Sequence, residues 1–389
     1  MKRSFLFLLF LFCLKNSFAQ SNSIKRKIGI FAPLYLDSVF KHSSYITGKK
    51  FPRFTLQGLD FVQGAKIALD SFPVNNATVE TIIYDTKSDS NTVRVLIEKK
   101  QLDDLDLMIG LVKDEDLNQL ADFGKTHQIP FLSTTLPNDN GIENNPYFII
   151  LNPTLKTHCE SIYSYLLQNH SSDNIIIARK SGTQEDKAEG YFKAINKQDK
   201  KDLLHLKSVL LDSNFTTIIK ELDSTKKNCI VGASLDEEFA KELISSLKKV
   251  DKKYEVAIFG MPNWNGFSAF GRNIKSDYRD VPFYFTSPYY NDKTDSICNV
   301  VQNKYLEAYK GLPSEMAFKG FEMMYFFSRM IVNHKEDFME RVNNSSAMLF
   351  TKYKILPVFS KDKKNSINYY ENKNLYFIKK LNGKTSKAW

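Results

Sequence analysis

The sequence predicts an α/β protein with two lobes, each built on a doubly wound parallel sheet. Short apolar runs of strand length alternate along the chain with longer amphipathic stretches of helical period. This alternation occurs in two series of similar length, which favours parallel sheets covered by helices on both faces. No low-complexity linker separates the two series, so the 389 residues are expected to form two closely coupled lobes.

The first series starts at the apolar run KIGIFAPLYL and contains four expected strands. Between the first two, Leu59, Val62, Ala65 and Leu69 recur at helical spacing, which predicts an amphipathic helix. Further along, Ser88, Asp89 and Ser90 are candidate N-caps of a second helix. The expected strands are 27–36, 79–85, 105–112 and 129–133, and the expected helices are 55–72, about 88–100 and 114–128.

The second series repeats this pattern and is followed by a different arrangement. Its expected strands are 148–151, 174–179, 203–210, 228–233, 255–260 and 281–286, and its expected helices are 154–167, 185–196, 215–222 and 236–250. Two long helices are then expected at about 296–310 and 314–333. The last two alternating segments, 350–359 and 374–381, are expected to be strands joined by a polar turn rich in Lys and Asn.

The first nineteen residues read as a signal peptide. A basic start, Met1-Lys2-Arg3, precedes an apolar run from Ser4 to Leu14 that is too short to span a membrane comfortably. Small residues in Ser17-Phe18-Ala19 predict cleavage before Gln20. Lipid anchoring through Cys13 is not expected, because Phe12 before it is not small. The mature chain is therefore expected to be exported to the periplasm and soluble.

Composition and charge exclude several classes of protein. With 42% hydrophobic and 25% charged residues, the chain is neither disordered nor collagen-like nor disulfide-dense. The net charge of +10 comes mainly from Lys scattered over expected helix ends and loops. Nucleic-acid readers cluster Arg and aromatic residues instead. No nucleic-acid partner is therefore predicted.

No catalytic or metal-binding template is found in the sequence. The phosphate-binding, dinucleotide-binding and nucleophile-elbow glycine motifs are absent, and no His forms an H-E-x-x-H motif. We therefore predict no enzyme, no cofactor and no metal site. Cys159, Cys229 and Cys298 lie far apart, each in an apolar-periodic segment, and are expected to be buried thiols. One disulfide with one free thiol is the alternative in an oxidising compartment.

A series of moderately specific segments spans nearly all of the mature chain in a characteristic order. These segments are IGIFAPL (28–34), GLDF (58–61), GAKIALD (64–70), YDTK (84–87), LMIG (107–110), IPFLSTT (129–135), YFII (147–150), FGMPN (259–263), FTSPYY (285–290) and the run from Pro313 to Glu322. In this order they resemble the type I periplasmic binding proteins, the Leu/Ile/Val-binding group associated with ABC transporters. The opening also resembles versions from Bacteroidetes-type bacteria, some of which carry a LysM peptidoglycan-binding module. No LysM-like segment is found here.

The resemblance implies two lobes joined by three crossover segments, with a ligand cleft between them. It implies an N-terminal lobe of residues 24–147 and 287–347 and a C-terminal lobe of residues 148–286 and 348–389. It also implies a small-molecule ligand and a membrane permease or envelope protein as partner.

The candidate ligand-binding residues follow the carboxyl ends of the expected strands, because ligands of open α/β sheets bind there. They are Tyr35, Lys113, Ser133, Thr134, Thr135, Ser181, Ser234, Asn263 and Trp264, with Tyr289 near a hinge. An α-amino acid is not the expected ligand. The family's amino-acid binders have hydroxyl residues after the third strand and an acid in the second lobe, where this chain has Leu111-Val112-Lys113 and Asn263. Lys113 and Trp264 would favour an anionic or ring-bearing ligand.

Two hypotheses of different class follow. The first is an exported solute-binding protein that captures a small polar molecule between its lobes for an ABC-type transporter. The second is a receptor or envelope regulatory module that uses the same fold to contact a protein or peptidoglycan without transport.

Overall fold

The computed structural model describes residues 24–48, 51–74, 77–198, 201–212, 215–271, 278, 280–343, 349–360, 363 and 365–388. The predicted signal peptide, its cleavage before Gln20 and Cys13 lie outside these residues. Within the described part of the chain, no helix has the length and apolar character needed to cross a membrane.

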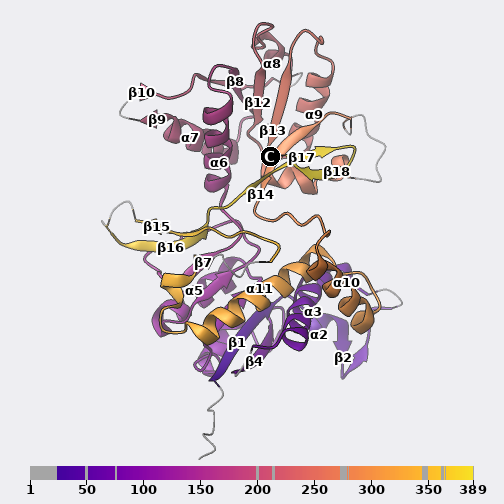
Figure 1. Cartoon of the computed structure of the whole chain (residues 1–389), viewed down its shortest axis with the longest axis vertical. Helices are drawn as coiled ribbons and strands as arrows, with labels where there is room; N and C mark the ends of the chain where they lie inside the picture. The colour runs from indigo at the N-terminus through magenta and orange to yellow at the C-terminus, as the bar shows by residue number, and fades with distance from the viewer. Residues whose placement is uncertain are drawn as a thin grey trace, which may run out of the picture.

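Two lobes stand one above the other, the second on top in Figure 1, and each is organised around one large sheet. Among the described residues, seven strands form the first sheet in the order β15-β16-β7-β6-β5-β1-β4. Only the β15–β16 pair in this sheet is antiparallel. The strands are β1 (Ile24–Ala32), β4 (Ala77–Asp85), β5 (Leu107–Gly110), β6 (Phe131–Ser133), β7 (Phe148–Ile150), β15 (Ile355–Phe359) and β16 (Ile367–Asn372).

The second sheet also has seven described strands, in the order β11-β8-β12-β13-β14-β17-β18. It is parallel up to β14, and the last two strands are added antiparallel. The strands are β8 (Asn174–Arg179), β11 (Leu206–Leu210), β12 (Asn228–Gly232), β13 (Val256–Gly260), β14 (Phe283–Ser287), β17 (Tyr376–Leu381) and β18 (Lys384–Lys387).

Helices cover both faces of each sheet, as the near-continuous apolar character of the central strands requires. The helices of the first lobe are α2 (Leu36–Val39), α3 (Leu56–Ser71), α4 (Val93–Glu98), α5 (Asp114–His127), α10 (Ser296–Tyr309), α11 (Glu315–Asn333) and α12 (Phe338–Arg341). Those of the second lobe are α6 (Leu155–Asn169), α7 (Thr183–Asn196), α8 (Thr216–Lys220) and α9 (Glu237–Lys248). The short elements are β2 (Phe40–Lys41), β3 (Ser44–Tyr45), β9 (Lys197–Gln198), β10 (Lys201–Asp202) and the 3-10 turns Arg53–Thr55, Pro262–Gly266 and Ser268–Phe270.

Strand β1 shows how alternation creates the two cores of the first lobe. Ile28 and Ile30 face the helices α3, α10 and α11 on one side of the sheet. Phe31 faces the other way and packs with Leu96 of α4 and Leu117 of α5. The predicted doubly wound α/β architecture is therefore confirmed in this lobe, and the second lobe has the same layered build.

Helices α3 and α11 pack backbone to backbone at two glycines. A Cβ added to Gly64 would overlap the carbonyl oxygen of Ala317, and one added to Gly320 would overlap that of Phe61. No side-chain rotation can relieve a clash with a backbone atom. These two positions therefore fix how closely the helices approach.

Three segments cross between the lobes, as predicted. Residues 151–154 lead from β7 to α6, residues 288–295 lead from β14 to α10, and residues 373–375 lead from β16 to β17. Figure 1 shows all three passing through the narrow waist of the molecule.

The expected hairpin between 350–359 and 374–381 is wrong. Strand β15 pairs instead with β16, which lies in the stretch expected to be a turn, and β17 belongs to the other sheet. The reason is long-range pairing. Strand β16 runs parallel to β7, with Tyr370 opposite Ile149, and so extends the first sheet.

The expected lobe boundaries are wrong in the same region. Strands β7, β15 and β16 lie in the first sheet, although residues 148–286 and 348–389 were assigned to the C-terminal lobe. The cysteine expectation is confirmed, because Cys159, Cys229 and Cys298 are all free and buried.

Candidate ligand-binding cleft

A cavity of about 760 Å³ lies between the lobes and takes its walls from both. The first lobe contributes the loop after β6 and a side chain of β16, and the second lobe contributes helices α6 and α7 and the loops after β12 and β13. The first two crossovers complete it. The lining residues are Thr135, Leu136, Pro137, Asn138, Asp139, Asn152, Thr154, Leu155, Lys156, His158, Gln184, Lys187, Tyr191, Leu235, Pro262, Asn263, Thr286, Ser287, Pro288 and Tyr369.

Two hydrogen bonds hold the first-lobe wall, one from the first crossover and one from β16. The side-chain amide of Asn152, in the first crossover, donates to the carbonyl oxygen of Thr135 at 2.6 Å. The Tyr369 hydroxyl donates to the Asp139 carboxylate at 3.0 Å. The only acid lining the described cavity therefore already has a hydrogen-bond donor.

The N-terminus of α6 is capped by a carboxylate from the first lobe. Glu371 of β16 accepts from the Thr154 backbone N–H at 2.7 Å and from the Thr154 and Thr157 hydroxyls at 2.9 and 2.7 Å. Its other oxygen accepts from the Lys373 ammonium at 2.5 Å. Glu371 is 1% exposed. Negative charge is favourable at a helix N-terminus, so this contact ties the lobes together at the waist and leaves that terminus already occupied.

His158 is the most deeply buried titratable side chain of the cavity wall. It is 1% exposed, and its Nδ1 shares a hydrogen bond of 2.7 Å with the hydroxyl of Thr286 on β14. Burial lowers the pKa of His158 to about 3, because the charged imidazolium loses its hydration. His158 therefore offers the cavity a neutral imidazole at physiological pH.

The buried His158 should make stability fall as the pH is lowered. An unfolded His takes up a proton near pH 6.5, whereas folded His158 stays neutral down to about pH 3. The unfolded state binds more protons in between, so the free energy of unfolding decreases from pH 6.5 downwards, by up to about 1.4 kcal/mol per pH unit. His158→Asn should show a shallower decrease in urea unfolding between pH 7.5 and pH 5. His205→Asn, at an exposed position, should behave as the parent does, and equal slopes in all three proteins would contradict the prediction.

The charged groups of the cavity wall are mostly positive. Lys156 lies 3.6 Å from Glu160 on the same helix. Lys187 of α7 has no ion-pair partner among the described residues. Gln184, Lys187 and Tyr191 follow one another at helical spacing along one face of α7 and all line the cavity. The wall can therefore offer a cation, an aromatic ring and several amides and hydroxyls to a bound molecule.

Two of the ten candidate residues from the sequence, Thr135 and Asn263, line this cavity. Ser133 and Thr134 precede Thr135 but are fully buried, and the Thr134 hydroxyl donates to the Gly110 carbonyl at 2.9 Å. Asn263 donates to the carbonyl of Leu235, another lining residue, at 2.6 Å. Of the three hydroxyl residues 133–135, only Thr135 is part of the wall.

Ser234 and Trp264 serve the packing of the second lobe. The Ser234 hydroxyl donates to Glu185 at 2.6 Å, and the Trp264 indole N–H donates to the Ser234 carbonyl at 2.8 Å. The Trp264 ring is 0% exposed and fills the space beside Gly232 and Gly260. Both glycines are needed there, because a Cβ would enter the indole ring.

The remaining four candidates lie outside the lining. Tyr35 is the N-cap of the short helix α2, Lys113 is the exposed N-cap of α5, and Ser181 is exposed just before α7. Tyr289 is in the second crossover, where burial raises the pKa of its hydroxyl. Asp85 also lies at the carboxyl end of a strand, β4, but its carboxylate shapes the loop after β1. It accepts hydrogen bonds from four backbone N–H groups, those of Leu34, Tyr35, Leu36 and Lys87.

Reasoning from strand ends missed the helical walls. The rule considers only residues that follow a strand. Asn152 lies in the first crossover, and Lys187 and Tyr191 lie on one face of α7. For Lys187 and Tyr191, the sequence signal is a polar stripe at positions 184, 187 and 191 of an otherwise half-buried helix. No such signal marks Asn152.

Two lobes with doubly wound sheets, joined by three crossovers and with a cavity of mixed polar and apolar lining between them, define the class of bilobed solute receptors with the type I fold. The chain belongs to the periplasmic binding protein family, whose model matches residues 53–341. This is a family of solute-binding receptors rather than enzymes. No curated protein sequence matches the chain significantly.

Solved structures share the fold at low sequence identity. A putative branched-chain amino acid ABC transporter from Rhodospirillum rubrum is 12% identical, with 94% of this chain and 99% of that chain covered and a TM-score of 0.65. An ABC-transporter solute-binding protein from Rhodopseudomonas palustris in complex with 3,4-dihydroxybenzoic acid is 12% identical, with 94% and 98% covered and a TM-score of 0.52. Haemophilus influenzae LpoA is 13% identical, with 94% and 59% covered and a TM-score of 0.58.

Proposed function

We propose that the chain is an exported solute-binding protein that takes a small polar molecule into the cleft between its lobes and delivers it to an ABC-type transporter. The observation that carries the proposal is the cavity of about 760 Å³ with polar side chains from both lobes in its wall. Ligand cavities of small molecules have this size and this position between lobes. The basic and apolar N-terminal segment, read as a signal peptide, agrees with export to the periplasm.

The chemistry of the wall favours a ligand with an anionic group and a flat or apolar part. Lys187 offers an ammonium without an ion-pair partner in the described chain, and Lys156 lies on the neighbouring helix. Tyr191 and Tyr369 add ring faces, and Asn152 and Asn263 add amides. The Rhodopseudomonas palustris protein, which binds an aromatic acid, shows that this fold can accept such a molecule.

Ligand binding would act on the equilibrium between open and closed arrangements of the lobes. The three crossovers are the only covalent links between the two sheets in the described chain. A molecule that contacts Thr135 on one side and Lys187 on the other has more partners when the lobes approach, so its binding favours the closed state.

The test is native mass spectrometry of the purified mature protein, followed by a thermal-shift screen of aromatic carboxylates, other organic acids, amino acids, sugars, peptides and muropeptides. A co-purified small molecule, or a melting temperature that rises with ligand concentration, is the expected result, because a ligand that binds only the folded state stabilises it. No co-purified mass and no shift with any compound would contradict the proposal.

Lys187→Met should weaken binding of an anionic ligand identified in this way by about 10-fold to 100-fold, since a hydrogen bond to a charged group is worth roughly 1.5–3 kcal/mol. Isothermal titration calorimetry measures the change. Lys125→Met, on an exposed face of α5 in the other lobe, is the matched control and should bind as the parent does. Equal affinity of the Lys187→Met variant would show that the ligand does not use this ammonium.

A second candidate function, an envelope interaction module, is favoured by one surface feature. Seven large apolar side chains between 36 and 56 are each between 38% and 52% exposed: Leu36, Phe40, Tyr45, Ile46, Phe51, Phe54 and Leu56. Exposed apolar patches of this kind mark contact sites for proteins or membranes. A negative ligand screen together with recovery of a specific envelope protein on the immobilised chain would favour this function over transport.

A further inference from the structure

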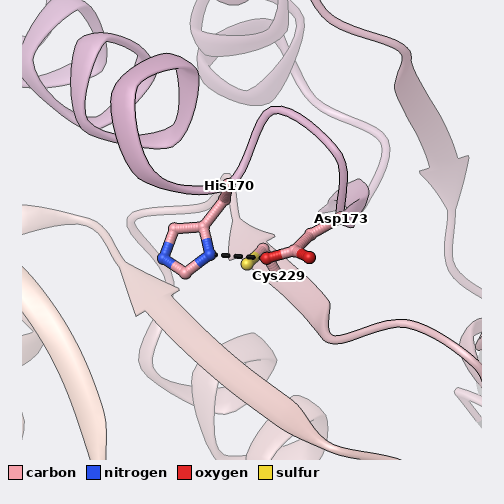
Figure 2. A group of neighbouring side chains, drawn as sticks. All are labelled: His170, Asp173 and Cys229. Atoms are coloured by element: carbon pink, nitrogen blue, oxygen red, sulfur yellow. Dashed lines mark hydrogen bonds and ion pairs between the residues drawn. The ribbon is translucent and has the colours of Figure 1, made fainter.

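Three side chains with metal-binding atoms converge in the second lobe, at the edge of the sheet opposite the cleft. They are His170, Asp173 and Cys229, and Figure 2 shows them pointing toward one another. One imidazole nitrogen, one carboxylate oxygen and the sulfur all lie within 4.8 Å of one another. None of the three lines the cavity between the lobes.

The fold holds these residues on rigid elements. His170 is the C-cap of α6, and a turn closed by the Asp173 N–H donating to the His170 carbonyl at 3.0 Å leads into β8. Strands β8 and β12 are parallel neighbours, with Cys229 opposite Ile175. Cys229 therefore lies beside the start of β8. Its partner there, Ile175, follows Asp173 by two residues.

We propose that His170, Asp173 and Cys229 form a binding site for a single Zn²⁺ ion. Imidazole nitrogen, thiolate sulfur and carboxylate oxygen are the ligands that zinc takes in proteins, and three protein ligands leave a fourth position for water. Tetrahedral coordination at about 2.0–2.3 Å places ligand atoms about 3.3–3.8 Å apart. His170 Nδ1 and the nearer Asp173 oxygen are 2.7 Å apart, and the three ligand atoms lie within 4.8 Å of one another. Coordination therefore requires side-chain rotations that separate the nitrogen from the oxygen and bring the sulfur to the ion.

Access and charge suit a cation at this position. The side chains of His170 and Asp173 are 11% and 22% exposed, which opens a path from solvent to the buried sulfur. A thiolate and a carboxylate together balance the charge of Zn²⁺. The neighbouring cation, Lys227, is paired with Glu255 at 3.2 Å, which reduces its repulsion of an incoming ion.

Binding must displace protons. Burial raises the pKa of the Cys229 thiol to about 12, so without metal the sulfur carries its proton. Formation of the zinc–sulfur bond releases this proton to solvent, and His170 coordinates through Nδ1 as the neutral tautomer protonated at Nε2. The hydrogen bond between His170 and Asp173 is replaced by their two bonds to the ion. Zinc affinity should therefore increase with pH.

No metal site is expected from the sequence, because Cys229 follows His170 by 59 positions and Asp173 by 56, and no C-x-x-C or H-E-x-x-H pattern is present. The pairing of β8 with β12 is what brings the thiol to the His170-x-x-Asp173 turn. This is a contact that only the register of the sheet decides.

The test uses the full mature chain, stripped with a chelator and titrated with Zn²⁺ in competition with a chromophoric chelator, and in parallel with Co²⁺. One Zn²⁺ per chain, and a thiolate-to-cobalt charge-transfer band in the near ultraviolet, are expected. Cys229→Ser should abolish the band. His170→Gln and Asp173→Asn should each weaken zinc binding at least about 10-fold, the lower end of what even outer-shell partners contribute.

Matched controls separate the site from general effects of substitution. Cys159→Ser removes another fully buried thiol of the same lobe, and His127→Gln removes a His at the end of a helix in the other lobe. Both should keep the cobalt band and the zinc affinity. If the Cys229→Ser variant does not fold, the zinc affinity of the Asp173→Asn variant, whose substitution is at a partly exposed side chain, tests the proposal by itself. Absence of stoichiometric binding, or a zinc affinity unchanged in Asp173→Asn, would overturn the proposal. Ligand binding in the cleft is a separate measurement and does not depend on this outcome.

Discussion

Replacing Gly64 with alanine should lower the free energy of unfolding by about 3 kcal/mol, the upper end of what overpacking of a core typically costs. A Cβ at this position would overlap the backbone carbonyl of Ala317, and α3 must move away from α11 to accommodate it. Moving α3 disturbs the packing of Phe61 and of the β1 core behind it. Chemical unfolding of the mature chain measures the loss.

Gly190→Ala is the matched control, because it changes another helix glycine with no atom within 4 Å of the added Cβ. That variant should be neutral or more stable by up to about 1 kcal/mol, the usual difference between Gly and Ala in a helix. Gly320→Ala, which overlaps the Phe61 carbonyl, should repeat the loss seen at Gly64. A Gly64→Ala variant as stable as Gly190→Ala would show that the two helices are not in backbone contact.

Glu371→Ala should also cost about 3 kcal/mol of stability, as expected when one partner of a buried charge network is removed. The substitution removes the acceptor of the Thr154 N–H and of two hydroxyls, and it removes the ion-pair partner nearest to the Lys373 ammonium. Because Glu371 joins the sheet of one lobe to a helix of the other, its loss should also shift the balance between open and closed lobes. Small-angle scattering with and without ligand reports that shift, and unfolding reports the stability.

The control for Glu371 is Glu98→Ala. The Glu98 side chain is 66% exposed and lies 3.8 Å from Arg94, and exposed pairs of this kind contribute at most about 1 kcal/mol. Glu371→Gln keeps an acceptor oxygen for the threonines and should lose less stability than Glu371→Ala. If Glu371→Ala were no more damaging than Glu98→Ala, the waist contact would have no energetic role.

The local elements could be predicted because they depend on segments whose burial pattern is visible in the sequence. Strand β8 has the predicted bounds, 174–179. Three Ile and one Ala follow one another in it, and a polar residue stands at each end. Helix α11 begins at Glu315, one residue after the predicted start at Ser314, because Ser314 is the N-cap and its hydroxyl accepts from the N–H groups of Met316 and Ala317. Periodicity and capping act within one turn or one strand, so they can be read locally.

The cleft could be predicted only in outline. The rule that ligands meet strand ends led to Thr135 and Asn263, and it also led to Ser234 and Trp264, which fill the core of the second lobe instead. A polar residue after a strand can face the cleft or cap the neighbouring loop, and the sequence does not distinguish the two. Lys187 and Tyr191 reach the cavity from a helix whose orientation depends on packing.

Local patterns in the sequence were enough to predict the α/β class, the two series of strands and helices, the buried cysteines and the resemblance to the periplasmic binding proteins. These depend on short-range patterns of apolar and polar residues. Three contacts come from the tertiary packing instead: β16 pairs with β7, Glu371 caps α6 from the other lobe, and Cys229 lies beside His170 and Asp173. Each of these contacts joins segments more than 50 residues apart, and its formation depends on strand register and lobe packing, which no local pattern encodes.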